Sequence, residues 1–247
     1  MQASTVRIHI GCAGWSLPRA TWPQFPAEGT HLVRYATRFS AVEINSSFYR
    51  PHRPETYARW AAGTPADFRF SVKLPRRITH EQRLHDCGLL LDTFLAEAGA
   101  LGDRFGVLLV QLPPSLAFAP AVAASFLQAL RAGFSGKVAW EPRHPSWFAA
   151  TATELLQEFR IARVAADPAP VPAAAQPAAW PGFAYFRLHG SPRMYYSAYA
   201  PAALEALAQE LRRRQAQGQE VWCIFDNTAE GAAVPDALQL RQQLGEP

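Results

Sequence analysis

The sequence predicts an α/β fold, a (β/α)8 barrel of the TIM type in which a proline-rich loop replaces most of the sixth helix. Short apolar segments, typical of buried parallel strands, recur eight times along the chain, and amphipathic segments fill most of the gaps between them. Strands joined by helical crossovers pair in parallel, and eight such units favour closure into a barrel. The alternative is an open doubly wound sheet, which shows the same alternation without closure.

The predicted strands are bounded by glycine, proline or polar residues. They cover residues 7–12, 41–46, 68–73, 106–112, 137–142, 162–167, 183–190 and 221–227. Helices are expected in most of the gaps, for example at residues 31–39, 89–101, 121–133, 152–159 and 202–214. The sixth connection differs, because residues 168–182 contain five prolines and cannot form a helix of ordinary length.

The composition indicates one large domain. The chain has 247 residues, of which 49% are hydrophobic and 18% charged, so it can bury a sizeable core. No internal repeat or linker divides it, and we expect a single domain over residues 1–247. The formal charge of +4 is carried mainly by arginine, since Lys73 and Lys137 are the only lysines, and such a bias gives little evidence of a nucleic-acid partner.

Cysteine usage and the ends of the chain predict a cytoplasmic protein. Cys12, Cys87 and Cys223 are far apart and form no CxxC pair, which argues for a reducing compartment. The first residues lack the pattern of a secretion signal, and no apolar segment reaches the roughly 18 residues that cross a membrane. We therefore expect no membrane partner, and the sequence does not indicate an oligomeric state.

Alternation within the strands predicts which side chains face the barrel axis. One set of alternate residues is apolar and faces the helices, so the polar set faces inward. The inward set comprises Glu43, Asn45, Arg69, Ser71, Lys73, Gln111, Ala139, Glu141, Arg143, Asp167, Tyr185, Arg187 and His189. Its charges concentrate toward the carboxyl ends of the strands, where barrel enzymes carry their active sites. Because an isolated buried charge costs several kcal/mol, these groups must pair, meet water or bind a ligand.

We expect this end of the barrel to bind an anionic ligand, either a phosphorylated small molecule or a nucleic acid. Lysine and arginine suit phosphate and carboxylate groups, and aromatic rings can contact a sugar or an unstacked base. The predicted ligand-binding residues are Trp15, Asn45, Tyr49, Lys73, His80, Gln111, Arg143, His144, Trp147, Arg187 and Asn227.

An enzyme of the hydrolase type is the favoured function. Hydrolysis of a phosphoester is the preferred candidate reaction. Glu43, Glu141 and His189 are the candidate acid–base residues. A non-catalytic barrel that binds an anionic ligand or nucleic acid is one alternative, and an inert network of ion pairs is another. Free lone pairs on a carboxylate or histidine would favour the enzyme, whereas a fully paired network would favour binding. Cys12 is a weaker candidate, as a nucleophile.

A divalent metal would suit a different set of strand-end residues. The succession Glu141, Asp167, His189 and Asp226 is similar to the metal ligands of sugar isomerase and apurinic endonuclease barrels, and would support a metal-assisted isomerase or endonuclease. Arg143 and Arg187 argue against a metal at this site, since nearby cations raise the electrostatic cost of binding a metal ion. No glycine-rich or Walker motif is present, so we expect no nucleotide cofactor.

Several motifs resemble the YecE-like family, domain of unknown function 72. They are GCAGWS, VEINSSFYR, FRFSVKLPRRITH, VLLVQLPPS, EPRHPSW, FRLHG and IFDNT, which occur in order between about Ile8 and Val234. The resemblance implies a TIM-barrel-like fold and no established reaction. Asp226 departs from the Asn-Asn pair that is common in the family at this position, so the resemblance does not support a role for its carboxylate.

Overall fold

The structure is a computed structural model that describes residues 6–245, and its strands fall where the sequence predicts them. The strands are β1 (Ile8–Cys12), β2 (Ala41–Ile44), β3 (Arg69–Lys73), β4 (Phe105–Gln111), β5 (Lys137–Glu141), β6 (Ile161–Arg163), β7 (Ala165–Asp167), β8 (Ala178–Ala179), β9 (Phe183–Leu188) and β10 (Glu220–Phe225). The predicted sixth strand is divided into β6 and β7. The very short strand β8 was not predicted.

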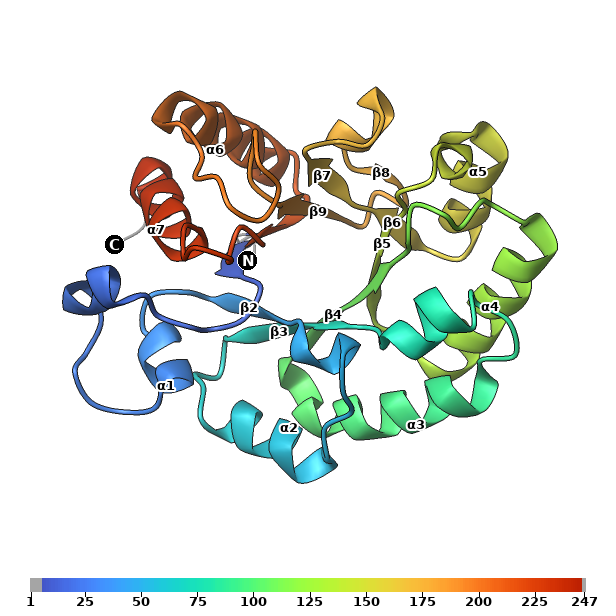
Figure 1. Cartoon of the computed structure of the whole chain (residues 1–247), viewed down its shortest axis with the longest axis horizontal. Helices are drawn as coiled ribbons and strands as arrows, with labels where there is room; N and C mark the ends of the chain where they lie inside the picture. Colours follow the sequence, from blue (N-terminus) through green and yellow to red (C-terminus); the bar gives the residue numbers. More distant parts are fainter. Residues whose placement is uncertain (1–5, 246–247) are drawn as a thin grey trace, which may run out of the picture.

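Helices surround the strands (Figure 1). The α-helices are α1 (His31–Tyr35), α2 (Pro54–Ala62), α3 (Gly88–Ala98), α4 (Pro120–Gly133), α5 (Ala150–Glu158), α6 (Pro201–Ala216) and α7 (Ala233–Leu244). Shorter helices are η1 (Arg19–Gln24), η2 (Ser46–Phe48), η3 (Arg77–Glu81), η4 (Gly99–Arg104), η5 (Pro145–Phe148) and η6 (Pro172–Ala175). Proline is the first residue of α2, α4 and α6, where its missing N–H has no helical partner to lose.

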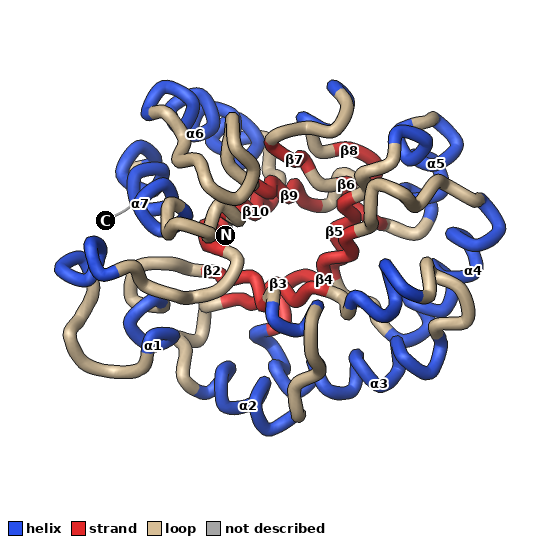
Figure 2. Tube along the Cα trace, viewed as in Figure 1, coloured by secondary structure: helices blue, strands red, loops and turns tan. Residues whose placement is uncertain are grey.

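The hydrogen-bonded strands form two sheets, with orders β1-β10-β9-β7 and β2-β3-β4-β5-β6-β8. Every neighbouring pair is parallel except β6 and β8. The α/β character and the parallel pairing are confirmed, but the ladder is not one continuous closed sheet. Figure 2 shows the strands of both sheets arranged around a common axis, with the helices outside them.

The two sheets adjoin at two places. At one, Val164 alone separates β6 from β7, and its N–H donates to the carbonyl of Trp140 at 3.0 Å. At the other, Ala13 and Glu43 form an isolated parallel bridge, and the Gly14 N–H donates to the Glu43 carbonyl at 2.9 Å. Gly11 permits this approach, because a Cβ atom there would lie 2.1 Å from the carbonyl oxygen of Ala41.

The proline-rich segment 168–182 contains no α-helix, as predicted, although it is not entirely irregular. It holds only η6 and the strand β8, which pairs antiparallel with β6. Two α-helices, α2 and α7, lie in gaps between strands for which no residue range was predicted. Both contain proline near their first turn, at Pro54 and Pro235, and proline usually signals an interruption.

The buried apolar side chains form two clusters, one on each side of the strands. The larger cluster lies between the strands and the helices. The smaller one consists of Ala41, Val107, Leu109, Ala139, Ala162, Val164, Phe183, Tyr185, Trp222 and Ile224. Its members alternate along their strands with members of the larger cluster, which supports the predicted parity in most strands. Asp167 is an exception, because it pairs with Leu188 and shares its parity with Ala165, and both belong to the larger cluster. Asp167 therefore does not face inward as predicted. No helix within residues 6–245 is long and apolar enough to cross a membrane.

Candidate functional site

Charged side chains from four strands meet at the carboxyl ends of the strands. Glu43 lies on β2, Glu141 ends β5, and Arg187 lies on β9. His189 and Asp226 follow the ends of β9 and β10. All five are buried. Because neighbouring strands are parallel, strand ends that are distant in sequence come together at the same end of the fold. The structure thus brings together the three predicted acid–base residues.

Arg187 is the centre of this network. Its Nε lies 3.0 Å from Glu43 Oε2, and its Nη2 lies 2.7 Å from Glu43 Oε1. Nη1 donates to Glu141 Oε2 at 3.0 Å, and Nη2 also lies 2.9 Å from Asp226 Oδ2. Burial alone would lower the pKa of Arg187, but the three carboxylates raise it well above its usual value. Arg187 is therefore permanently charged and compensates carboxylates from three strands.

Tyr185 and Ser71 complete the surroundings of Glu43. The Tyr185 hydroxyl lies 3.1 Å from Glu43 Oε2 and 2.8 Å from Ser71 Oγ. Both carboxylate oxygens of Glu43 therefore have partners, and its side chain is inaccessible to solvent. A ligand would reach Glu43 only if Arg187 moved. Both Ser71 and Tyr185 were predicted to face inward, but nothing in the sequence indicated their hydrogen bonds.

His189 lies between two carboxylates. Its Nδ1 is 3.0 Å from Asp226 Oδ2, and its Nε2 is 3.1 Å from Glu141 Oε1. Burial would lower the pKa of His189, but the charge of Glu141 and the hydrogen bonds to both carboxylates raise it above its ordinary value. The pKa of Glu141 is held well below its usual range despite burial, chiefly by Arg187. The geometry favours an imidazolium that donates from both nitrogens.

Arg143 connects the network to solvent. Its Nε and Nη2 donate to Glu141 Oε1 at 3.1 and 3.0 Å, and its Nη1 donates to the Tyr195 hydroxyl at 3.2 Å. Its side chain is 17% exposed, in contrast to Arg187. Tyr195 lies in the loop between β9 and α6, within a segment rich in aromatic residues (193–201), and was not among the predicted site residues. Its position after a strand end was the one signal that could have suggested it.

Lys73 differs from the other cations of the site. It ends β3 and is only 5% exposed, yet its ammonium group makes no hydrogen bond or ion pair within residues 6–245. Its Nζ lies 4.2 Å from the centroid of the Phe48 ring. Burial, and secondly the charge of Arg187, lower the pKa of Lys73 to about 8. It is therefore a mostly buried cation whose ammonium group keeps some contact with solvent and lacks an anionic hydrogen-bond partner among the described residues.

Other predicted binding residues lie at the same end of the strands. The His80 ring packs edge-on to Phe48 at 4.9 Å, and burial together with Lys73 lowers its pKa to about 4. His80 is therefore neutral near pH 7. Asn45 directly follows β2, and its buried Oδ1 has no hydrogen-bond partner. Gln111 ends β4, and its side chain makes no hydrogen bond to any residue that the structure describes.

The aromatic residues predicted to contact a ligand are separated by the structure. Trp147 is 1% exposed, its indole donates to the Leu116 carbonyl at 2.9 Å, and it packs against Trp140. Trp147 is a core residue, so its predicted contact with a ligand is not supported. Trp15 packs edge-on to Trp60, whereas Tyr49 is 74% exposed.

Two polar candidates have structural partners. The His144 Nδ1 accepts from the Ser146 N–H at 3.2 Å and caps η5. The Asn227 Nδ2 donates to Asp236 Oδ2 at 2.7 Å and to the Ser197 carbonyl at 3.0 Å, so it holds the loop after β9. Neither side chain contacts the Arg187 network. Burial raises the pKa of Cys12 to about 12, which disfavours it as a nucleophile.

The residues predicted to hold a metal do not form a ligand set. Glu141, His189 and Asp226 are adjacent, but both nitrogens of His189 face carboxylates and Arg187 occupies the space between the acids. Asp167 makes no side-chain hydrogen bond or ion pair with them. Within the described part of the chain, no group of three or more His, Cys, Asp or Glu side chains is arranged to hold a metal ion. The donor set does not fit the predicted divalent metal.

Comparisons with known proteins identify relatives along nearly the whole chain. Residues 9–247 match the family described as protein of unknown function DUF72. The protein YecE of Escherichia coli strain K12 is 35% identical over 175 residues, which span 68% of this chain and 61% of that protein. YunF of Bacillus subtilis strain 168 is 33% identical over 76 residues, or 31% of this chain and 27% of its own. The resemblance to the YecE-like family is confirmed.

Solved structures of DUF72 family proteins have the same fold. One from Enterococcus faecalis V583 superposes with a TM-score of 0.81 at 22% identity, covering 98% of this chain and 96% of its own. One from Thermotoga maritima MSB8 gives a TM-score of 0.78 at 25% identity, covering 97% and 99%. These structural similarities support the fold but do not indicate a reaction.

Proposed function

Since this chain belongs to the DUF72 family of proteins of unknown function, we propose a function from its site, namely that it binds an anionic ligand at the carboxyl ends of the strands. In this proposal the two sheets act together as one TIM-type barrel. The Ala13–Glu43 bridge and the shared segment of β6 and β7 support that arrangement. The ligand is phosphorylated or derived from a nucleic acid.

The observation that carries the proposal is the state of Lys73. The carboxylates of Glu43, Glu141 and Asp226 are already paired with arginine or histidine. Lys73 therefore adds a buried positive charge that the network does not neutralise by direct contact. Burying a charge without a partner is costly, and an anion at the ammonium group would remove part of that cost. Arg143 is the partly exposed guanidinium on the same network, and it would supply a second contact.

The paired state of the acids favours binding over catalysis. Glu43 is enclosed by Arg187 and Tyr185, and the pKa of Glu141 is held well below its usual range, chiefly by Arg187, so neither carboxylate is a ready proton donor. Hydrolysis of a phosphoester is the second candidate, favoured by one observation. His189 is held as a proton donor beside the cation Arg143, with Nη2 of the arginine 3.5 Å from Nε2 of the imidazole. To protonate a leaving oxygen, His189 would have to exchange its hydrogen bond to Glu141 for one to the ligand.

A thermal-shift screen tests the binding proposal. The ligands are sulfate, inorganic phosphate, a hexose phosphate and a short single-stranded oligonucleotide, with the unphosphorylated hexose as control. We expect at least one anion to raise the melting temperature of the wild-type protein, because a ligand of the native state stabilises it. Lys73→Met should lower the affinity for that anion roughly tenfold, as expected for loss of a charged hydrogen bond, and should therefore reduce the shift in melting temperature. Lys73→Arg should retain much of the shift. If no anion shifts the melting temperature, or if Lys73→Met responds as strongly as wild type, the proposal fails.

A further inference from the structure

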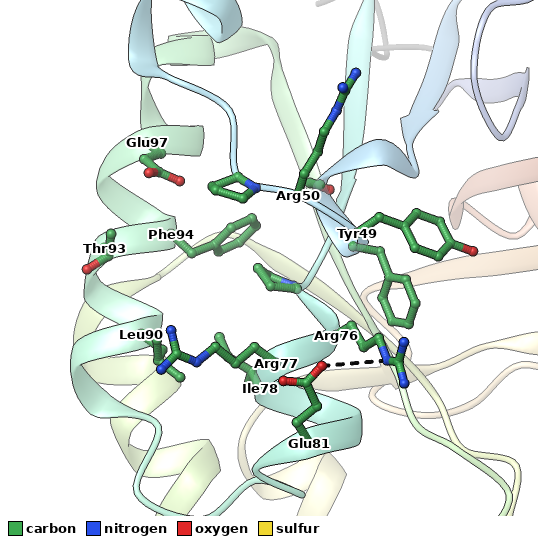
Figure 3. Close-up of a pocket in the computed structure, with 14 residues that line it drawn as sticks. Tyr49, Arg50, Arg76, Arg77, Ile78, Glu81, Leu90, Thr93, Phe94 and Glu97 are labelled. Carbon is green, nitrogen blue, oxygen red and sulfur yellow. Dashed lines mark ion pairs between the residues drawn. The ribbon is translucent and has the colours of Figure 1, made fainter.

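A pocket lies outside the network, between η2, η3 and α3. It has a volume of about 490 Å³ and is lined by Ser47, Phe48, Tyr49, Arg50, Pro51, Pro75, Arg76, Arg77, Ile78, Glu81, Leu90, Thr93, Phe94 and Glu97. A volume of this size is typical of small-molecule sites. Figure 3 shows Phe94 projecting from α3 into the pocket, opposite the loop that carries Tyr49. The pocket is therefore a preformed hollow with an aromatic side chain in its lining.

The pocket combines an apolar interior with a cationic rim. Phe48, Ile78 and Phe94 are buried and contribute the apolar interior. The charged lining residues are three arginines and two glutamates, so positive charge is in excess. Arg76 is loosely paired with Glu81 at 3.7 Å, and both are exposed. Arg77 makes no ion pair with any residue that the structure describes, and Figure 3 shows its side chain extending toward Leu90 on α3.

We propose that this pocket is a binding site for a small amphipathic anion, such as an aromatic carboxylate. The ring of the ligand would contact Phe94 and Ile78, where it is shielded from water. Its carboxylate would lie at the rim and pair with Arg77, whose planar guanidinium suits a carboxylate. This site is distinct from that of the proposed function, because neither Lys73 nor Arg143 lines the pocket, although Lys73 contacts Phe48, which does.

Binding of three matched probes to the full chain tests the site. The probes are 3-phenylpropionate, its uncharged amide and propionate. Their binding is measured by ligand-observed NMR and calorimetry. We expect 3-phenylpropionate to bind, the amide to bind roughly threefold more weakly because the exposed ion pair is lost, and propionate not to bind. Equal affinity for the acid and the amide would overturn the role of the arginine rim. Absence of binding by both aromatic probes would overturn the site itself.

Substitutions locate the binding. Arg77→Gln should weaken binding of the acid to the level of the amide, and should leave the amide unaffected. Arg53→Gln is the control, because Arg53 is also exposed and does not line the pocket. Leu90→Trp, at a half-buried position of α3, should fill the pocket and prevent binding of both aromatic probes. Lys73→Met should not change the affinity, which separates this site from that of the proposed function. Unchanged binding in both Arg77→Gln and Leu90→Trp, each folded by circular dichroism, would refute the assignment.

Discussion

Both carboxylate oxygens of Glu43 are held by the guanidinium of Arg187, with Oε1 at 2.7 Å from Nη2 and Oε2 at 3.0 Å from Nε. Neither side chain is accessible to solvent. A bidentate pair of this kind is specific in its geometry, and removing one partner leaves an uncompensated buried charge. The pair therefore makes β2 and β9 depend on each other although they belong to different sheets.

Replacing Arg187 should strongly destabilise the fold. Arg187→Met removes the partner of Glu43, Glu141 and Asp226 at once, and we expect the free energy of unfolding to fall by about 3–5 kcal/mol. Urea denaturation at pH 7 measures the change. Arg7→Met is the control. The Arg7–Asp67 ion pair has the same 3.0 Å separation as the Arg187–Glu141 pair, but the Arg7 side chain is 57% exposed. Loss of this exposed pair should lower the free energy of unfolding by about 0–1 kcal/mol. Similar losses in the two variants would contradict the role given to Arg187.

The pKa of Lys73 predicts how anion binding depends on pH. Burial lowers this pKa to about 8, so the ammonium group is charged at pH 7 and largely neutral at pH 9. The affinity for an anion that contacts Lys73 should fall roughly tenfold between these two pH values, in proportion to the charged fraction. Calorimetric titration with inorganic phosphate or the best anion of the screen measures it. Lys73→Arg should bind with little change over the same range, and an equally steep decline in that variant would exclude Lys73 as the titrating group.

Much of this site could be predicted from alternation in the strands. Glu43, Glu141 and Arg187 occupy polar positions of otherwise apolar strands, and parallel pairing carries such positions to one end of the fold. Alternation does not report which inward-facing side chains contact one another, however. It could not show that Arg187 binds both carboxylate oxygens of Glu43, or that Lys73 lies beside Phe48 without an anionic partner.

The loops were less predictable because their side chains follow no simple period. Trp147 and Tyr49 both come shortly after polar strand ends, yet η5 turns the first into the core and η2 turns the second toward solvent. Tyr195 contacts Arg143 from a loop whose path depends on Asn227 and other tertiary contacts. The helices α2 and α7 fit the predicted alternation of strands and helices, but their residue ranges were not predicted. Each has a proline near its first turn, where proline is well tolerated.

The different surroundings of these two aromatic residues should appear in their stabilities. Trp147→Ala removes a fully buried indole and its hydrogen bond, and we expect a loss of about 3–5 kcal/mol in the free energy of unfolding. Tyr49→Ala should change stability by no more than about 0.5 kcal/mol, since the ring is mostly exposed. Chemical denaturation of both variants tests the pair. A mild effect of Trp147→Ala would return that residue to the candidates for ligand contact.

The raised pKa of His189 predicts a pH-dependent contribution to stability. Because its pKa in the folded chain lies above the ordinary value, which the unfolded chain is expected to have, the protonated imidazole stabilises the folded state. This contribution is complete below the unfolded pKa of about 6.5. It is lost as the pH rises through the folded pKa. The difference in free energy of unfolding between wild type and His189→Gln should therefore shrink from pH 6 upward. A constant difference would show that folding does not raise the pKa of His189, and a growing difference would show that folding lowers it.

Glu141 separates the two candidate functions. Its carboxylate accepts from Arg143 and Arg187 and lies 3.1 Å from Nε2 of His189, so it orients the proposed proton donor. If the chain hydrolyses a phosphoester, Glu141→Gln should lower turnover by about 10²–10⁴-fold, the range typical of acid–base groups, while the affinity for a non-hydrolysed anion changes little. Turnover is followed by phosphate release from a panel of phosphomonoesters and oligonucleotides, and affinity by thermal shift. If the wild-type chain binds an anion but releases no phosphate from any member of the panel, the site is a binding site, as its fully paired acids favour.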